Sequence, residues 1–284
     1  MKIAMFTNVY PPHDGDQASA VDRFARELES KGNQILIVAP PFDQGNKGHQ
    51  EEATAQTASA TGENEESTAE AQAHLRVLRT QALTNLMGSG LSLPTSEVSE
   101  LSEQVAEFDP DIIHAYQPLF LGETALVIGS RLQKPVVATH QNLLARLKEQ
   151  LPDEGVLNGA DIQKRMIQHA NLCHGLVAPT QTVADSLRQG GVQNKIQITP
   201  TGVDIDEYGK GDGAGFRQKS GIGEEDFVFG HVGRLDAEKN LHFLTEAVAR
   251  ALQELPEAHF LLVGDGGLKE ELGEFFRSKG LEER

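Results

Sequence analysis

The sequence predicts an α/β protein built on parallel sheets, with one Rossmann-like domain and the start of a second one. Two observations carry this prediction. Short aliphatic, β-branched runs alternate with amphipathic helical segments, and the alternation restarts after a segment rich in Gly, Asp and Pro at 201–211. Strands that alternate with helices form parallel sheets covered on both faces. We therefore expect one domain at 1–200, a linker at 201–211 and a partial domain at 212–284.

The first domain begins with an apolar run at 2–7, which suits a central strand. Apolar residues at helical spacing follow, so we expect a helix that Gly32 ends. The later strands are expected at 34–38, 75–78, 111–114, 135–139, 175–178 and 196–199. The later helices are expected at 96–107, 122–132, 143–150, 160–172 and 181–189. Thr180 is placed to cap the last of these helices.

The second region repeats the pattern over a shorter length. We expect strands at 227–232 and 259–263, each followed by an amphipathic helix, at 241–252 and 268–279. Two strands and two helices are too few for a doubly wound domain that is stable alone. We therefore expect the chain to stop within a fold, with unpaired strand edges that favour self-association.

The composition excludes several classes of protein. There are 25 basic and 42 acidic residues, for a net charge of −17, which argues against a nucleic-acid-binding face and against electrostatic docking on anionic lipid. The single cysteine, Cys173, excludes an intramolecular disulfide and a cysteine-only metal site. No apolar run of about 18 residues and no signal peptide are present, so a cytoplasmic protein is expected.

One segment of the chain has an acidic composition. Residues 49–73 contain glutamates but no lysine or arginine, and no apolar side chain larger than alanine. Such a composition cannot bury enough surface to offset its ordering entropy, so we expect a disordered acidic loop over 43–73. The remaining acidic excess fits either an ordinary acidic protein or one adapted to a high-salt cytoplasm.

Three stretches resemble a known family. They are ITPTGVDIDEY at 198–208, FVFGHVGRLDAEKNLHFLTEAV at 227–248 and HFLLVGDGGLKEEL at 259–272. They resemble the retaining glycosyltransferases of family 4, which have the GT-B architecture of two Rossmann-like domains. Residues 114–144 are similar to the bacterial enzymes that glucosylate diacylglycerol. The run GRLDAEKN is the most specific part, and the resemblance covers nearly all of the chain except the acidic loop.

The resemblance implies a cytoplasmic enzyme that moves a hexose from a nucleotide diphosphate sugar to a lipid or glycan acceptor with retention. It implies neither a cofactor nor a metal. Residues 1–200 would be the acceptor-side domain, and 212–284 the start of the nucleotide-sugar-binding domain. Family members continue into a Glu-x7-Glu region, so we expect a truncated second domain. The alternative is a non-catalytic GT-B-like binding protein or a subunit of a split enzyme.

Gly233, Arg234 and Lys239 are the candidate donor-binding residues of the second domain. Arg234 follows a predicted strand, and Lys239 lies near the start of the next helix. Two cations beside a helix N-terminus favour an anion, and the resemblance implies that they bind the donor diphosphate. The alternative from the residues alone is a surface pairing with Asp236 and Glu238.

Gly15 and Asp16 form the turn after the first strand. The resemblance implies that this turn approaches the donor phosphate, where close approach requires glycine. In ungapped register Asp16 falls on the family's glycine, and a carboxylate there would repel a diphosphate. Either Gly15 takes over the role through a local shift, or the site is damaged. The alternative is an ordinary Asp-Gly turn.

His140 and Gln141 are the candidate catalytic residues. They follow the predicted strand PVVAT, and active-site groups gather at the carboxyl ends of parallel strands. The resemblance implies a histidine near the sugar, which falls on Gln141 in ungapped register, one residue after His140. His114 and Tyr116 are placed in a matching loop. The alternative for His140 is a merely hydrogen-bonded strand-end histidine.

Two other features have a structural and a functional interpretation. An apolar stripe of Leu143, Leu144, Leu147 and Leu151 would either pack in the core or contact a membrane peripherally, at its inner face. The turn Gly264–Gly267 could cradle a phosphate, but its pattern differs from GxGxxG and the family uses it structurally.

Overall fold

The computed structural model describes residues 1–12, 16–41, 74–83, 93–94, 97–141 and 159–284. These residues form two compact units, Met1–Val203 and Asp204–Arg284. Gly15, the acidic loop predicted over 43–73, and the helix and leucine stripe predicted over 143–151 lie outside the described residues.

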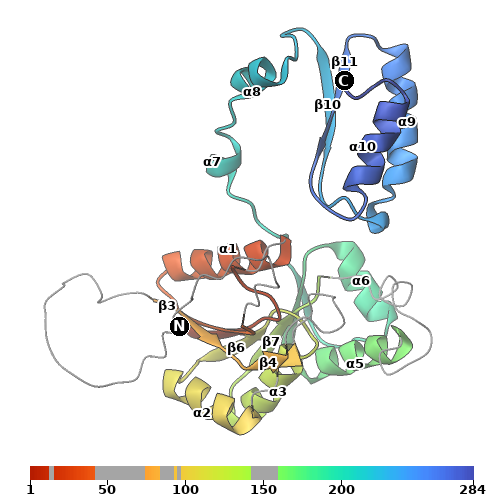
Figure 1. The fold of residues 1–284 in the computed structure, drawn as a ribbon. Helices are drawn as coiled ribbons and strands as arrows, with labels where there is room; N and C mark the ends of the chain where they lie inside the picture. The colour runs from red at the N-terminus through yellow and green to blue at the C-terminus, as the bar shows by residue number, and fades with distance from the viewer. Residues whose placement is uncertain (13–15, 42–73, 84–92, 95–96, 142–158) are drawn as a thin grey trace, which may run out of the picture. The chain divides into compact units, whose positions relative to one another are not determined.

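The first unit is built on a seven-stranded parallel sheet (Figure 1). Its strands are β1 (Lys2–Phe6), β2 (Gln34–Ala39), β3 (Leu75–Arg79), β6 (Ile112–Ala115), β7 (Val136–Thr139), β8 (Gly175–Ala178) and β9 (Ile196–Ile198). The order across the sheet is β3-β2-β1-β6-β7-β8-β9. This is the Rossmann order, in which the chain winds outward in both directions from a switch point between β1 and β6. The predicted fold class is confirmed.

Helices cover both faces of this sheet, as expected for buried parallel strands. They are α1 (Asp16–Ser30), α2 (Val98–Phe108), α3 (Leu121–Leu132), α5 (Gly159–Leu172) and α6 (Gln181–Gln189). α1 packs on Ile3, Met5 and their neighbours in β2, while α2 and α3 pack against the opposite face (Figure 1). The predicted cap is present, since the Thr180 hydroxyl accepts a 3.2 Å hydrogen bond from the amide of Val183.

Two short elements of the first unit were not predicted. β4 (Ala82–Leu83) and β5 (Leu93–Pro94) pair antiparallel as a two-residue ladder. Strands this short leave no periodic pattern in the sequence, so hydrophobic alternation could not reveal them.

The second unit contains two parallel strands, β10 (Phe227–Val232) and β11 (Ala258–Val263). Its helices are α7 (Ile205–Tyr208), α8 (Gly213–Ser220), the 3-10 turn η2 (Ala237–Lys239), α9 (Leu241–Glu254) and α10 (Lys269–Ser278). α7 is a single helical turn inside the segment predicted to be a linker, and a turn this short cannot show periodicity in the sequence. α8 was not predicted either, because none of its residues is buried.

α9 and α10 pack on one face of the β10–β11 sheet (Figure 1). The other face carries Val232 and Val263, whose exposed fractions are 81% and 47%. Self-association of the second unit stays a prediction.

Candidate functional site

The side chains of Asn8 and Gln117 connect the segments that follow β1 and β6 at the switch point. The Gln117 side-chain oxygen accepts hydrogen bonds from the backbone N–H of Asn8 at 2.8 Å and from the Thr7 hydroxyl at 3.0 Å. The Asn8 side-chain oxygen accepts a 3.1 Å bond from the amide of Leu121, the first residue of α3. These contacts fix the carboxyl ends of both strands, where ligands of such sheets bind. Sequence reasoning missed Asn8 and Gln117, although each lies two residues beyond the end of a strand.

His140 directly follows β7 and is completely buried. Neither of its ring nitrogens has a hydrogen-bond partner among the described residues. Burial lowers its pKa to about 3, and the nearby His169, whose ring centre lies 6.1 Å away, is the smaller of the two causes of this shift. His140 is therefore a neutral imidazole at physiological pH, able to donate one hydrogen bond and accept another.

Gln141 and Tyr116 meet across the ends of β7 and β6. The Gln141 side-chain amide donates a 3.1 Å hydrogen bond to the Tyr116 hydroxyl. Burial raises the pKa of Tyr116, which remains protonated. The structure thus brings the candidate Gln141 into contact with Tyr116. His114 does not lie in that loop: it is part of β6, and its Nε2 lies 2.7 Å from the Thr139 hydroxyl.

His169 of α5 is also buried and lies near the carboxyl ends of the strands. His169 Nε2 lies 3.0 Å from the carbonyl oxygen of Gly122, so this nitrogen carries the hydrogen and donates it. Its Nδ1 lies 3.8 Å from the Cys173 sulfur, within range to accept the thiol hydrogen. Burial raises the pKa of Cys173 to about 12, so the thiol stays protonated. Cys173 is thus a buried packing residue of the first unit.

The buried histidines predict a pH-dependent stability of the first unit. Burial lowers the pKa of His114 to about 4 and that of His140 to about 3, whereas unfolded histidines titrate near 6.5. Below pH 6.5 the unfolded chain takes up protons that the folded unit cannot, so stability falls with falling pH. The slope reaches about 1.4 kcal/mol per pH unit for each histidine.

Urea unfolding at pH 7, 6 and 5 measures this slope. His140→Gln should reduce this slope by about 1.4 kcal/mol per pH unit, the contribution of one histidine. His242→Gln changes an exposed histidine of the second unit and should leave the slope unchanged. An identical slope in His140→Gln and wild type would contradict the buried, neutral state of His140.

The predicted donor-binding residues lie between β10 and α9. The Arg234 guanidinium donates to Asp236 at 2.8 Å and also to Glu238. Lys239 Nζ lies 3.8 Å from the same Glu238 carboxylate. The surface pairing considered from the sequence is therefore formed. Arg234 is nevertheless 58% exposed, so both cations remain accessible to a ligand at the start of α9.

The turn Gly264–Gly267 contacts residues 233–236, the segment that carries Gly233 and Arg234. A Cβ atom at Gly264 would lie 1.9 Å from the carbonyl oxygen of Gly233, and Gly264 has a φ of 156°. The Leu235 amide donates to the Asp265 carbonyl at 2.8 Å, and the Gly267 amide to Asp236 at 3.2 Å. These contacts favour the structural interpretation of this turn over phosphate binding.

Asp16 is the first residue of α1. Over the ranges that the structure describes, no three His, Cys, Asp or Glu side chains are grouped to hold a metal ion. In the same ranges, every helix is too short or too polar to cross a bilayer.

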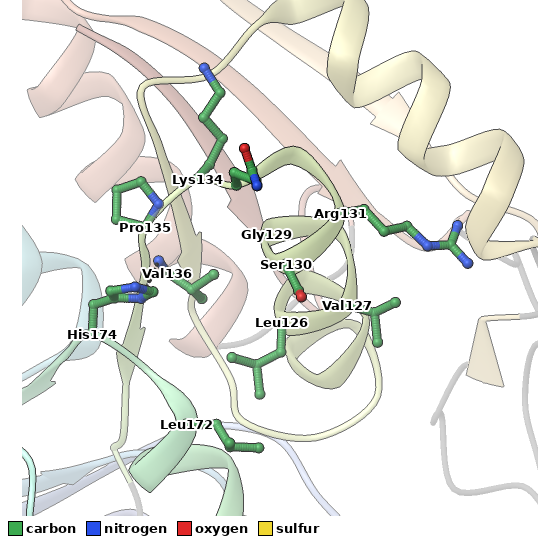
Figure 2. A pocket seen from close by; sticks show the side chains of 11 residues that line it. Leu126, Val127, Gly129, Ser130, Arg131, Lys134, Pro135, Val136, Leu172 and His174 are labelled. Carbon is green, nitrogen blue, oxygen red and sulfur yellow. Dashed lines mark hydrogen bonds between the residues drawn. The ribbon is translucent and has the colours of Figure 1, made fainter.

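A hollow of about 780 Å³ lies beside α3, at the amino end of β7 (Figure 2). Leu126, Val136, Leu172 and His174 line it, and the Arg131 side chain extends away from them (Figure 2). His174 is already engaged, since its Nδ1 accepts a 3.1 Å bond from the Val136 amide. The hollow is thus at the opposite end of β7 from His140 and Gln141.

Comparison with known proteins agrees with this geometry. The model of Glycosyltransferase Family 4 matches residues 17–207, which is more than half of the chain. The chain belongs to Glycosyltransferase Family 4. The model of Glycosyl transferases group 1 matches residues 214–284, in the second unit. In this family 4 chain the two family models match the first and the second unit, in the order that the resemblance implies.

Two curated relatives align with nearly all of this family 4 chain. A GDP-mannose-dependent alpha-mannosyltransferase from Corynebacterium glutamicum is 26% identical over 269 residues, 94% of this chain and 58% of the relative. An alpha-monoglucosyldiacylglycerol synthase from Streptococcus pneumoniae is 20% identical over 280 residues, 96% of this chain and 58% of the relative. Across the first four curated relatives, the chain spans 34% to 58% of their length.

Solved structures show the same fold. The crystal structure of Anabaena HepE in complex with UDP matches all of this chain and 68% of HepE, with a TM-score of 0.67 and 21% sequence identity. The similarity confirms the GT-B type of fold for the family 4 chain.

Proposed function

We propose that this chain transfers a hexose from a nucleotide diphosphate sugar to a lipid or glycan acceptor, with retention of the anomeric configuration. One observation carries the proposal: Arg234 and Lys239 are both accessible and flank the turn that leads into α9. The positive end of a helix and two cations suit a diphosphate. The names of several relatives support a nucleotide sugar, as do the UDP and UDP-glucose in the HepE structures.

The proposed chemistry places charge stabilisation on the donor side. When the glycosidic bond breaks, the diphosphate leaves with both bonding electrons and gains negative charge. The Arg234 guanidinium can contact two phosphate oxygens at once, while Lys239 acts as a point charge. Both residues would stabilise the transition state more than the ground state, which is the requirement for catalysis. No metal is needed for this role.

On the acceptor side, the proposal assigns His140 and Gln141 to contacts with the transferred sugar. A neutral His140 can exchange hydrogen bonds with a sugar hydroxyl without carrying charge. Gln141 is already oriented by its bond to Tyr116. On the donor side, the proposal places the backbone of Gly233 next to the bound nucleotide sugar. We also propose that the turn containing Gly15 and Asp16 approaches the donor phosphate.

The experiment is a release assay for UDP and GDP with the purified chain. UDP-glucose or GDP-mannose is supplied with diacylglycerol vesicles or soluble glycans, and the anomeric configuration of any product is read by NMR. Acceptor-dependent release, insensitive to EDTA and with the donor configuration kept, is the expected result. An inverted product would contradict retention, and absence of donor binding would contradict the whole assignment.

A second candidate function is a non-catalytic binding protein. It is favoured by the Arg234 pairing with Asp236 and Glu238, which already neutralises the cation. The same assay separates the two candidates. Nucleotide sugar binding without release over many hours, with every acceptor supplied, would support the binding protein.

A further inference from the structure

Two side-chain contacts connect the carboxyl ends of β6 and β7. His114 Nε2 lies 2.7 Å from the Thr139 hydroxyl oxygen, and the Gln141 amide donates a 3.1 Å hydrogen bond to the Tyr116 hydroxyl. His114 lies opposite Val137 in the register of the two strands, so Thr139 is two residues further along β7. Gln141 follows Thr139 by two residues, as Tyr116 follows His114. The two contacts are therefore successive steps along the same pair of strands.

The rings of His114, Tyr116 and Phe24 contact one another. The ring centres of His114 and Tyr116 are 5.6 Å apart. Phe24, on α1, meets the His114 ring edge-on at 5.6 Å and lies 6.1 Å from the Tyr116 ring. His114 and Tyr116 are each only 5% exposed. Rings packed this closely leave no room for one of them to move alone, so the position of the Tyr116 ring depends on that of His114.

His114 reaches the candidate site through other residues. Its side chain is buried, and burial lowers its pKa to about 4, so it is uncharged at physiological pH. Its Nε2 is engaged with Thr139, the residue that ends β7 and directly precedes His140. The segment that carries His140 and Gln141 therefore begins at a position that His114 helps to fix.

We propose that His114 is a positioning residue for Gln141, the side chain assigned to the transferred sugar. Through the Thr139 hydroxyl it fixes the end of β7, and through its ring it fixes the Tyr116 hydroxyl that accepts the bond from Gln141. An amide that donates one hydrogen still offers a second hydrogen and an oxygen, which suit a sugar hydroxyl. Such contacts weaken steeply when the geometry is lost. This inference rests on the proposed function, because that function assigns Gln141 to the sugar.

The first test compares the affinities of the purified chain for UDP-glucose and UDP by calorimetry. The two probes share the nucleotide, so the ratio of their affinities reports the sugar contact; GDP-mannose and GDP replace them if the release assay selects that donor. His114→Leu, Thr139→Val and the reference variant Gln141→Leu should each reduce the ratio about 3- to 10-fold, the effect of one lost hydrogen bond. UDP affinity itself should not change. His114→Gln, whose amide nitrogen can replace Nε2, should keep the wild-type ratio.

His174→Gln is the matched control for this comparison. His174 also bonds to β7, since its Nδ1 accepts a 3.1 Å hydrogen bond from the Val136 amide, but it does so at the amino end of the strand. Its replacement should leave the ratio of affinities unchanged.

The second test needs no ligand. The side-chain amide signal of Gln141 in a nitrogen–proton NMR spectrum is identified by its absence in Gln141→Leu. Tyr116→Phe shows where this signal lies without the hydrogen bond. The signal should move toward that position in His114→Leu and Thr139→Val, and it should stay at the wild-type position in His114→Gln. If His114 only stabilised the core, its replacement would lower thermal stability and leave the Gln141 signal in place.

The outcomes separate this inference from the proposed function. Either an unchanged Gln141 signal or an unchanged affinity ratio in both His114→Leu and Thr139→Val, where Gln141→Leu reduces the ratio, would overturn this inference alone. If His114→Leu does not fold, Thr139→Val decides, because valine keeps the shape of the residue. Absence of UDP binding by the wild type, or an unchanged ratio in Gln141→Leu, would instead contradict the proposed function. The NMR comparison would then still decide whether His114 positions the Gln141–Tyr116 pair.

Discussion

Replacing Gly264 with alanine is expected to unfold the second unit. The new Cβ would lie 1.9 Å from the Gly233 carbonyl oxygen and 3.0 Å from its carbon, so backbone atoms rather than a flexible side chain would have to move. The φ of 156° at Gly264 is also a conformation that other residues rarely adopt. We expect a loss of about 3 kcal/mol or more, at the upper end of single-substitution effects.

Hydrogen exchange with mass spectrometry measures this loss locally. In Gly264→Ala the peptides of β10 and β11 should exchange much faster, while those of β1 and β6 keep their protection. Gly267→Ala is the matched control, because its Cβ would meet no atom within 4 Å and its φ is not positive. Equal protection of β10 in the two variants would show that the turn accommodates the alanine by a small backbone shift. The turn would then not be what positions residues 233–236.

The sheet and its helices could be predicted because their burial leaves a periodic record. β1 and β2 are nearly continuous apolar runs, since both of their faces are covered, and Ala18, Val21 and Ala25 mark the buried side of α1. The turn of α7 and the pair β4–β5 lacked such a record. Their residues are too few to alternate, so only tertiary contacts define them.

The site could be predicted only to the level of strand ends. Position after a strand indicated His140 and Gln141, and helix-start cations indicated Arg234 and Lys239. The pattern could not show that His140 has no hydrogen-bond partner or that Gln141 contacts Tyr116. Such facts depend on which strands become neighbours, and β6 and β7 are brought together by an intervening helix.

Arg79 illustrates the same limit. In the sequence it is one of two arginines in an ordinary edge strand, and nothing indicates its contacts. Its contacts with the Tyr10 ring and the Pro40 carbonyl oxygen come from the segments that follow β1 and β2. Sequence spacing carries no information about that meeting.

Arg234→Ala is expected to weaken UDP binding about 10- to 100-fold. A hydrogen bond to a charged group contributes about 1.5–3 kcal/mol, which corresponds to that range. The existing pairs with Asp236 and Glu238 do not prevent this, because exposed ion pairs contribute only about 0–1 kcal/mol. A phosphate can therefore displace one carboxylate at small cost. Lys239→Ala should have a smaller effect, because a single ammonium binds without the guanidinium's paired donors.

Glu238→Gln separates a donor-binding Arg234 from a structural one. Removing this carboxylate frees Arg234 and Lys239 together, so UDP should bind more tightly than to the wild type. Arg277→Ala is the control, because Arg277 is a comparably exposed arginine of the same unit, 3.3 Å from Glu282. Isothermal titration of UDP into all four variants gives the comparison. If Arg234 only stabilises its turn, Glu238→Gln would lower thermal stability and leave UDP affinity unchanged. Tighter UDP binding by Glu238→Gln with weaker binding by Arg234→Ala is the result expected if this guanidinium contacts the diphosphate.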